Sequence, residues 1–328
     1  MRIPTYLSYS AFAKFESNLI EFFYSYLSPT RADRMPQEQP AAAGSAWDAY
    51  VKSALYFALF GKCDTKYEFQ SLFEAQVEPH NRDWAIDAGK YVFECYQVSG
   101  LYDTLLDLLK RSIEPPRFEF SVNADILGVP FTGKPDCRFV LPGPVHVIHD
   151  FKLNGFCSKS SVSPAKGYRL CVDGFKADKQ NKSHNTAHKQ YSPQLVHDFE
   201  IDTNCLEDCN TDWADQLSLY AWAMGEPVGS PFVLSIDQCV AKPLFSGYPL
   251  LRFSNYRARV RESYQQHLAK RFTGVWDVIK SGYIFRHLTR EESDAKCKIL
   301  EKAAVMLQSD GTEQGDFFVE AVRTKYRG

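Results

Sequence analysis

The residues best suited to catalysis lie between positions 128 and 155. Asp136 follows a Gly-Lys-Pro sequence, and Asp150 and Lys152 stand two positions apart in a largely apolar segment. Side chains two positions apart on a strand point to the same face of a sheet, so Asp150 and Lys152 should share a face. Asp136 is expected to end a strand over 129–134. If this strand and the one over 145–151 form a hairpin around Pro142–Pro144, Asp136 approaches Asp150 across the ladder. The segment therefore predicts two carboxylates and a lysine converging at one point.

Such a group of charges can serve hydrolysis. Neighbouring carboxylates repel each other unless a cation lies between them, and their oxygens suit Mg²⁺ or Mn²⁺. A metal ion of this kind turns a bound water into a nucleophile and stabilises charge on a phosphoryl oxygen. Lys152 would neutralise developing negative charge or orient the water. The alternative is a solvated strand face, because an Asp-x-Lys sequence also arises by chance.

A second polar pair lies on a predicted helix over residues 211–224. Gln216 and Tyr220 are four positions apart and are therefore neighbours on one helical face. They could reach a phosphate or a base while an apolar row holds the helix against the sheet. An amphipathic helix with a tyrosine at its rim is the alternative interpretation. The apolar row consists of Trp213, Leu217, Ala221 and Met224.

The order of these motifs resembles the RecB-like branch of the PD-(D/E)XK nuclease superfamily, which includes CRISPR-associated and phage-encoded exonucleases. The resemblance rests on Gly-x-x-Asp at 133–136, Asp-x-Lys at 150–152 and Gln-x-x-x-Tyr at 216–220. The sequence LSYSAFAKF at 7–15 is similar to a Ser-rich opening helix of that branch. The resemblance implies a restriction-endonuclease-like fold and a site for Mg²⁺ or Mn²⁺.

Two further positions follow from the same resemblance. GSAWD at 44–48 places Asp48 where relatives carry a metal-binding His, and a carboxylate can replace an imidazole on a hard metal ion. Glu119 matches a Glu that relatives often carry, although an exposed strand residue would look the same. By resemblance, metal binding is expected of Asp48, Asp136 and Asp150, catalysis of Glu119, Asp136, Asp150 and Lys152, and substrate binding of Gln216 and Tyr220.

Hydrophobic periodicity predicts an α/β or α+β fold, in which helices flank a mixed sheet. Residues 1–288 are expected to form a single nuclease domain, with a helical region at 41–112, a catalytic core at 113–254, and a C-terminal helix and tail at 289–328. A loop is predicted at 30–46. Predicted helices span 8–27, 45–60, 83–97, 101–112, 211–224 and 258–281, and predicted strands span 117–125, 129–134, 145–151, 232–240 and 249–254.

The segment between Lys152 and Gln216 is longer than the resemblance suggests. Residues 155–197 contain seven Lys or Arg against two Asp or Glu, whereas 198–215 contain seven acidic residues and no basic one. A basic insert at 155–200 could hold a phosphate backbone, and a solvated loop is the alternative. Aromatic residues in it that could stack on bases are Tyr168, Phe175 and Tyr191.

Nine scattered cysteines favour free thiols in a reducing compartment. Those near the insert lack a C-x-x-C pair, which disfavours zinc. Some relatives hold an iron–sulfur cluster through a group of cysteines near the C-terminus, where this chain has only Cys297, so no iron–sulfur cluster is expected.

The 328 residues carry a net charge of −2, which excludes a chain-wide basic coat but not a basic groove. Neither a secretory signal nor an apolar run of about 18 residues is visible, so no membrane partner is expected. The expected setting is the cytoplasm of a bacterium or of a phage-infected host cell. No P-loop sequence occurs, so any ATP-driven unwinding would come from a helicase partner.

The leading hypothesis is a metal-dependent DNase, an exonuclease that acts on DNA ends in recombination, repair or phage DNA metabolism. DNA is then the expected partner, with a helicase or a single-strand annealing protein as a possible second one. A catalytically silent nucleic-acid-binding protein that keeps the fold is the first alternative. A structure-specific endonuclease or an RNase is another.

Overall fold

The computed structural model describes residues 3–28, 36–61, 64–159, 168–172, 175–177, 199–201, 204–244 and 247–282. Most of the basic insert and the helix predicted after residue 289 lie outside the described residues. The chain forms two compact units. The larger unit contains the described parts of 37–122 and 134–265, and the smaller unit contains those of 1–36, 123–133 and 266–328.

A five-stranded sheet in the order β1-β4-β5-β9-β10 forms the centre of the larger unit. Strands β5 and β9 are parallel and the other neighbours are antiparallel, so the predicted mixed sheet is confirmed. Cys137 pairs with His149, and continuing this register sets Asp136 opposite Asp150. The strands are β1 (Arg117–Phe118), β4 (Cys137–Leu141), β5 (Val145–Asn154), β9 (Val233–Lys242) and β10 (Leu250–Ala258).

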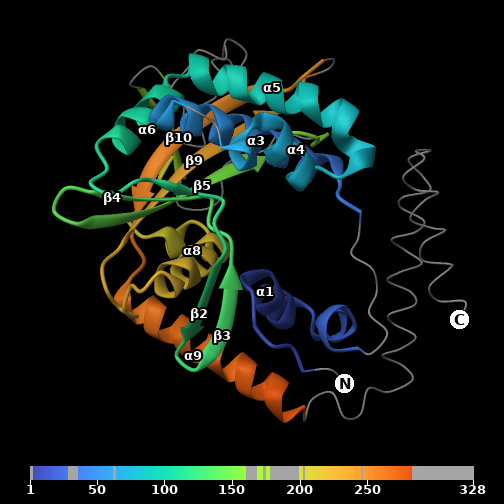
Figure 1. Ribbon diagram of the computed structural model, residues 1–328, viewed down its shortest axis with the longest axis vertical. Helices are drawn as coiled ribbons and strands as arrows, with labels where there is room; N and C mark the ends of the chain where they lie inside the picture. The colour runs from blue at the N-terminus through green and yellow to red at the C-terminus, as the bar shows by residue number, and fades with distance from the viewer. Residues whose placement is uncertain are drawn as a thin grey trace, which may run out of the picture. The chain divides into compact units, whose positions relative to one another are not determined.

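Helices flank both faces of this sheet, as predicted (Figure 1). The helices are α3 (Gln39–Phe60), α4 (Phe69–Gln76), α5 (Arg82–Val98), α6 (Leu101–Lys110) and α8 (Thr211–Ala223). Figure 1 shows α3, α4, α5 and α6 on one face and α8 on the other. Val147 and Phe151 of β5 are buried in the core that contains Trp47 of α3, whereas Asp150 and Lys152 alternate with them and point toward α8. Central strand β5 thus carries apolar packing on one face and polar chemistry on the other.

The smaller unit combines three separate parts of the chain. Leu7 forms a backbone bridge to Phe131, and Phe12 and Phe131 both pack edge-on against Phe272. Burial of these rings joins the N-terminal segment, a hairpin and the last described helix in one core. Its elements are α1 (Tyr9–Ser17), α2 (Leu19–Phe22), a π-helical turn (Phe23–Leu27), β2 (Val122–Ile126), β3 (Val129–Gly133) and most of α9 (Glu262–Ser281).

Three short strands lie in and beside the basic insert. They are β6 (Tyr168–Val172), β7 (Phe175–Ala177) and β8 (Phe199–Ile201), and they form an antiparallel sheet in the order β7-β6-β8. The described part of this segment therefore contains strands as well as loop.

The predicted strand over 117–125 is wrong as a single element. β1 ends at Phe118, and Glu119 has a φ of 46°, a left-handed conformation that breaks a strand. The alternating pattern continues into β2, but β2 pairs with β3 in a separate sheet. The strand at 129–134, which was expected to pair with β5, is β3 and pairs with β2 instead. The partner of β5 is β4, which was not predicted and which begins just after Asp136. Alternation alone shows which residues can form strands but not which strands pair.

The helices lie close to their predicted positions, because long periodic segments are strong signals. α5, α6, α8 and α9 agree with the predicted ranges to within a few residues. α3 begins at Gln39 instead of 45, because Pro40 fits the first helical turn, where no N–H donor is needed. The predicted helix over 8–27 begins after Ser8 as expected but breaks at Asn18, and α4 was not predicted. None of the described helices has both the length and the apolar composition to cross a bilayer.

Helices α3 and α5 approach closely at a glycine. A Cβ atom on Gly89 would lie 2.5 Å from Ala46 Cβ and 2.8 Å from the Ala46 carbonyl carbon. Because one of these neighbours is backbone, rotating a side chain cannot relieve the contact and the helices would have to separate. Ala46 precedes Asp48 by two residues, so this crossing also holds Asp48 in place.

We expect Gly89→Ala to destabilise the protein by about 1–3 kcal/mol, the usual cost of overpacking. Urea unfolding followed by circular dichroism measures the change. Gly274→Ala is the matched control, because a Cβ there meets no atom within 4 Å on helix α9. It should be neutral or stabilising by up to about 1 kcal/mol. Equal losses in the two variants would contradict a tight α3–α5 crossing.

Candidate functional site

Helix α3 supplies two charged residues of the candidate site. Asp48 and Lys52 are four positions apart and thus neighbours on one helical face. The helix is anchored beside them by Trp47, whose ring packs edge-on against Tyr96 and Phe151 at centroid distances of 5.6 and 5.7 Å. This apolar packing fixes where Asp48 and Lys52 enter the site.

Lys52 is fully buried and lies at the centre of three carboxylates. Its ammonium is 2.6 Å from Asp48 Oδ2 and 2.9 Å from Asp136 Oδ1. It also forms an ion pair with Glu119 Oε1. A buried ammonium is tolerated only when it is paired and hydrogen-bonded, and here all three partners are charged acceptors. This arrangement is the densest cluster of ion pairs among the described residues.

Glu119 enters the cluster from the turn after β1. Its side chain is 6% exposed and also forms an ion pair with Lys134, which is on the solvent side with 53% exposure. The Glu119 N–H donates to the Asp136 carbonyl oxygen at 3.2 Å, and the Glu119 carbonyl oxygen accepts a hydrogen bond from Lys66 Nζ at 3.3 Å. A left-handed conformation at a non-glycine residue costs about 1–3 kcal/mol, so these contacts must hold Glu119 in place.

Asp136 connects this cluster with β5. Its Oδ1 accepts a hydrogen bond from Lys52, while its Oδ2 accepts one from the Phe151 backbone N–H at 3.1 Å. The side chain is 22% exposed. Asp136 therefore faces the α3 carboxylates with one oxygen and the strand that carries Asp150 with the other.

Strand β5 and helix α8 complete the site. Lys152 forms an ion pair with Asp150 on the same face of β5 and donates to Gln216 Oε1 at 3.0 Å. Gln216 Nε2 donates in turn to the Tyr220 hydroxyl at 3.3 Å. Lys152 Nζ also lies 5.9 Å from the centroid of the Trp213 ring, within range of a cation–π contact. The α8 residues therefore orient the Lys152 ammonium.

The carboxyl groups next to β5 have unequal proton affinities. Burial alone would raise the pKa of Asp136, but the Lys52 ammonium and a hydrogen bond from Asp150 hold it below its usual range. Burial raises the pKa of Asp150 to about 8, with Lys152 opposing the shift and the charge on Asp136 adding to it. Asp150 is consequently protonated far more readily than Asp136, and the two carboxyl groups share the proton that they bind.

Burial and neighbouring charges also set the pKa values of Asp48 and Lys52 on α3. Burial raises the pKa of Asp48 to about 7, opposed by Lys52 and reinforced by the charges of Asp136 and Glu119. Burial alone would lower the pKa of Lys52, but the charges of the three carboxylates raise it well above its usual value. Lys52 is therefore an ammonium ion at every pH at which the protein would be studied.

The carboxylates near Lys52 have the spacing of a site for a hard cation. Asp48, Glu119 and Asp136 each offer one oxygen, and the three oxygens lie within 4.8 Å of one another. Oxygens on opposite sides of Mg²⁺ are about 4.2 Å apart, so a small side-chain adjustment would suffice. The buried Oδ1 of Asp48 receives no hydrogen bond from the described residues. These residues could hold Mg²⁺ or Mn²⁺, although Lys52 already contacts all three.

The structure brings all seven sequence-predicted residues into one connected set of contacts. Asp48, Glu119 and Asp136 all contact Lys52, and Asp136 lies beside Asp150. Asp150 pairs with Lys152, which bonds to Gln216, and Gln216 bonds to Tyr220. The cluster of close oxygens contains Glu119 in place of Asp150, which pairs with Lys152 instead. Tyr220 is only 8% exposed and offers little surface to a nucleic acid.

Lys52 was not predicted as part of the site. Its signal was present in the sequence, because Asp48 and Lys52 have the i,i+4 spacing of an ion pair. Lys52 is also the one charged residue within the run Ala49–Phe60. Its neighbours Val51 and Leu55 are apolar in sequence and buried in the structure. Their apolar character could have suggested that Lys52 also points inward.

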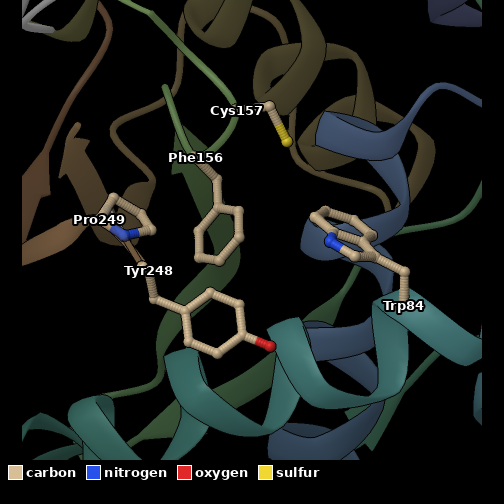
Figure 2. Close-up of a pocket in the computed structure, with 6 residues that line it drawn as sticks. Trp84, Phe156, Cys157, Tyr248 and Pro249 are labelled. Carbon is tan, nitrogen blue, oxygen red and sulfur yellow. The ribbon is translucent and has the colours of Figure 1, made fainter. Parts of the chain in front are cut away.

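The larger unit also has a cavity of about 340 Å³ beyond the end of β5. It is lined by Trp84 of α5, by Phe156 and Cys157, and by residues 247–249, which precede β10. Figure 2 shows the Trp84 ring on one side of the opening and the Phe156 and Tyr248 rings on the other. The rings are not parallel, because Trp84 packs edge-on against Phe156 at a centroid distance of 6.1 Å. Phe156 follows Lys152 by four residues, which limits their Cα separation to about 14 Å.

Comparisons with protein-family models and with curated proteins find no match. A solved structure titled "Crystal structure of SSO0001" aligns with 80% of this chain and 84% of its own chain, at 11% identity and a TM-score of 0.24. A score at this level carries no argument about fold or function.

The proton held by Asp150 predicts a pH-dependent stability. The folded pKa of about 8 exceeds the ordinary value of 3.8, so between these pH values the folded protein binds a proton that the unfolded chain has lost. The stabilisation is complete below about pH 4 and is lost as the pH rises through 8. In EDTA, we expect the free energy of unfolding to fall between pH 7 and 9 by up to about 1.4 kcal/mol per pH unit.

Urea unfolding of the wild type and of Asp150→Asn at pH 7, 8 and 9 tests this expectation. The variant should show a flatter profile, because the titrating group is gone. Asp107→Asn, which removes an exposed carboxyl group on α6, should keep the wild-type slope. The assignment fails if Asp150→Asn loses stability with pH as steeply as the wild type.

Proposed function

We propose that this chain is a metal-dependent nuclease that hydrolyses DNA phosphodiester bonds, with a site of the PD-(D/E)XK type. The observation that supports it most is the contact set Asp136–Asp150–Lys152–Gln216. Its members come from the turn before β4, from β5 and from α8, and Lys152 and Gln216 are 64 positions apart. Chance Asp-x-Lys sequences have no reason to converge with a second carboxylate and a helix-borne amide.

The balance of charge at the site also favours a cation. Four carboxyl groups are grouped there, and two lysines, Lys52 and Lys152, lie among them. Lys134, whose side chain is 53% exposed, pairs with Glu119 from the solvent side. Burial and mutual repulsion raise the pKa of both Asp48 and Asp150, so excess negative charge is relieved by protons in the metal-free protein. A divalent cation would relieve it without protonating the ligands.

Within this proposal the residues have separate roles. Asp136, with Asp150 and the α3-side carboxylates Asp48 and Glu119, would hold the metal ion. The ion would supply an activated water and charge stabilisation on the phosphoryl oxygens. Lys152, oriented by Gln216, would stabilise negative charge that develops on the phosphate. The rigid frame of β5 and α8 holds the ammonium in place before the substrate arrives.

The finer proposal is an exonuclease in recombination, repair or phage DNA metabolism, and it rests on the motif resemblance alone. Its partner would be DNA, with a helicase or a single-strand annealing protein as a second one. The proposed setting is the cytoplasm of a bacterium or an infected host cell. Degradation of linear but not of closed circular DNA would support it, whereas cutting of the circle would identify an endonuclease.

A catalytically silent nucleic-acid-binding protein is the second candidate. The position of Lys52 favours it, because an ammonium ion already contacts Asp48, Glu119 and Asp136. Binding of labelled DNA without cleavage in either Mg²⁺ or Mn²⁺ would select this alternative.

The nuclease proposal predicts a large effect of one substitution. Lys152→Met should lower the rate of DNA cleavage by about 100-fold or more, the usual effect of removing a group that stabilises transition-state charge. Cleavage of end-labelled linear DNA is measured by gel electrophoresis with Mg²⁺, with Mn²⁺ and with EDTA. The wild type should be active with a metal ion and inactive with EDTA.

Lys90→Met is the matched control for Lys152→Met. Lys90 lies on α5 with a side chain 60% exposed and pairs only weakly with Glu94 at 3.8 Å. This variant loses the same charge and should cleave like the wild type. Metal-independent cleavage, or equal activity of Lys152→Met and the wild type, would refute the proposed site.

A further inference from the structure

The ammonium of Lys52 stands where a metal ion would have to bind. It contacts the carboxylates of Asp48, Glu119 and Asp136, the same three side chains whose oxygens lie within 4.8 Å of one another. Lys52 is 0% exposed, so the contact is not a surface ion pair that salt or water can easily replace. One buried lysine thus occupies the centre of the group that best fits a hard cation.

The lysine and the carboxylates depend on each other. An ammonium ion taken out of water is costly unless charged acceptors surround it, and Lys52 has three. Three carboxylates this close repel one another unless a cation separates them, and Lys52 provides that positive charge. Removing either side would leave uncompensated charge in the interior.

A metal ion and the ammonium cannot occupy this position together. Both would need the same oxygens, and two positive charges a few Å apart repel strongly in a partly buried site. Lys52 lies well inside the 22-residue helix α3, far from a frayed end, so only its side chain can move away. Withdrawal of the side chain is therefore the step by which the oxygens become available.

We infer that Lys52 is a built-in cation of the Asp48–Glu119–Asp136 cluster, which holds the cluster together without metal and competes with divalent metal ions for it. This inference rests on the proposed function only in taking Mg²⁺ or Mn²⁺ as the competing ion. Lys52 is a positioning and regulatory residue of the cluster. It differs in this from Lys152, whose partners are Asp150 and Gln216.

Measuring metal affinity without DNA tests the competition directly. Mn²⁺ is titrated into metal-free protein, and the free ion is followed by electron paramagnetic resonance with calorimetry as a second method. Lys52→Met removes the charge and keeps an unbranched side chain that is one atom shorter. It should bind Mn²⁺ at least about tenfold more tightly than the wild type, because the competing charge is gone.

Two variants control for charge and for packing. Lys134→Met removes a positive charge that contacts Glu119 from the solvent side. Because the Lys134 side chain is 53% exposed, water and salt screen its charge, and the Mn²⁺ affinity should change by less than about threefold. Lys52→Arg keeps the charge at the centre and should not bind Mn²⁺ more tightly than the wild type. Equal Mn²⁺ affinities of folded Lys52→Met and the wild type would overturn the inference.

Thermal unfolding gives a readout that does not depend on activity. In EDTA, Lys52→Met should unfold at a lower temperature than the wild type, because the carboxylates lack a counter-ion. Mn²⁺ should restore most of this loss, since a ligand of the folded state stabilises it, while the wild type should respond much less. If Lys52→Met folds neither with nor without Mn²⁺, Lys52→Arg decides, and tighter metal binding by that variant overturns the inference.

These outcomes are separable from those of the nuclease proposal. If the wild type cleaves DNA and Lys52→Met binds Mn²⁺ no more tightly, the nuclease proposal stands and the inference that Lys52 competes with metal ions is overturned. If the wild type does not cleave DNA and Lys52→Met binds Mn²⁺ about tenfold more tightly, the inference about Lys52 is supported and the nuclease proposal is refuted.

Discussion

The candidate site depends on how four crowded carboxyl groups are kept together inside a folded protein. Their mutual repulsion is offset by two ammonium groups that enter from different helix–strand contacts, Lys52 with Asp48, Glu119 and Asp136, and Lys152 with Asp150. Removing one partner of such a buried set usually costs about 3–5 kcal/mol, because the remaining charge has neither water nor a counter-ion. The fold therefore has to keep each of these carboxyl groups next to a lysine.

The topology of the sheet meets this constraint. Helix α3 and helix α8 lie on opposite faces, yet each provides a polar group for the same end of the β4–β5 hairpin (Figure 1). This is possible because Asp136 stands at the start of β4, where one of its oxygens turns toward α3 and the other bonds to the β5 backbone. A carboxylate in the middle of a strand would be restricted to one face.

The sequence was sufficient for the parts of this arrangement that follow local rules. Helical periodicity located α5, α6, α8 and α9, and two-residue alternation placed Asp150 and Lys152 on one face of β5. It was not sufficient where partners are distant in sequence. The strand after Phe118 breaks because Glu119 is drawn into the cluster by Lys52 and Lys134, and no local pattern encodes that contact. The pairing of β4 with β5, and the separate β2–β3 sheet, are decided in the same way by tertiary packing.

Asp48 and Lys52 are best understood together. Under the proposed function, the position of Asp48 would otherwise carry a neutral imidazole, so the aspartate adds a negative charge to a cluster that already contains Glu119 and Asp136. Lys52, one helical turn later, contacts that added charge at 2.6 Å and also reaches both other carboxylates. The negative charge of Asp48 is therefore balanced by a positive charge on the same helical face. An aspartate at position 48 thus has a physical counterpart in Lys52.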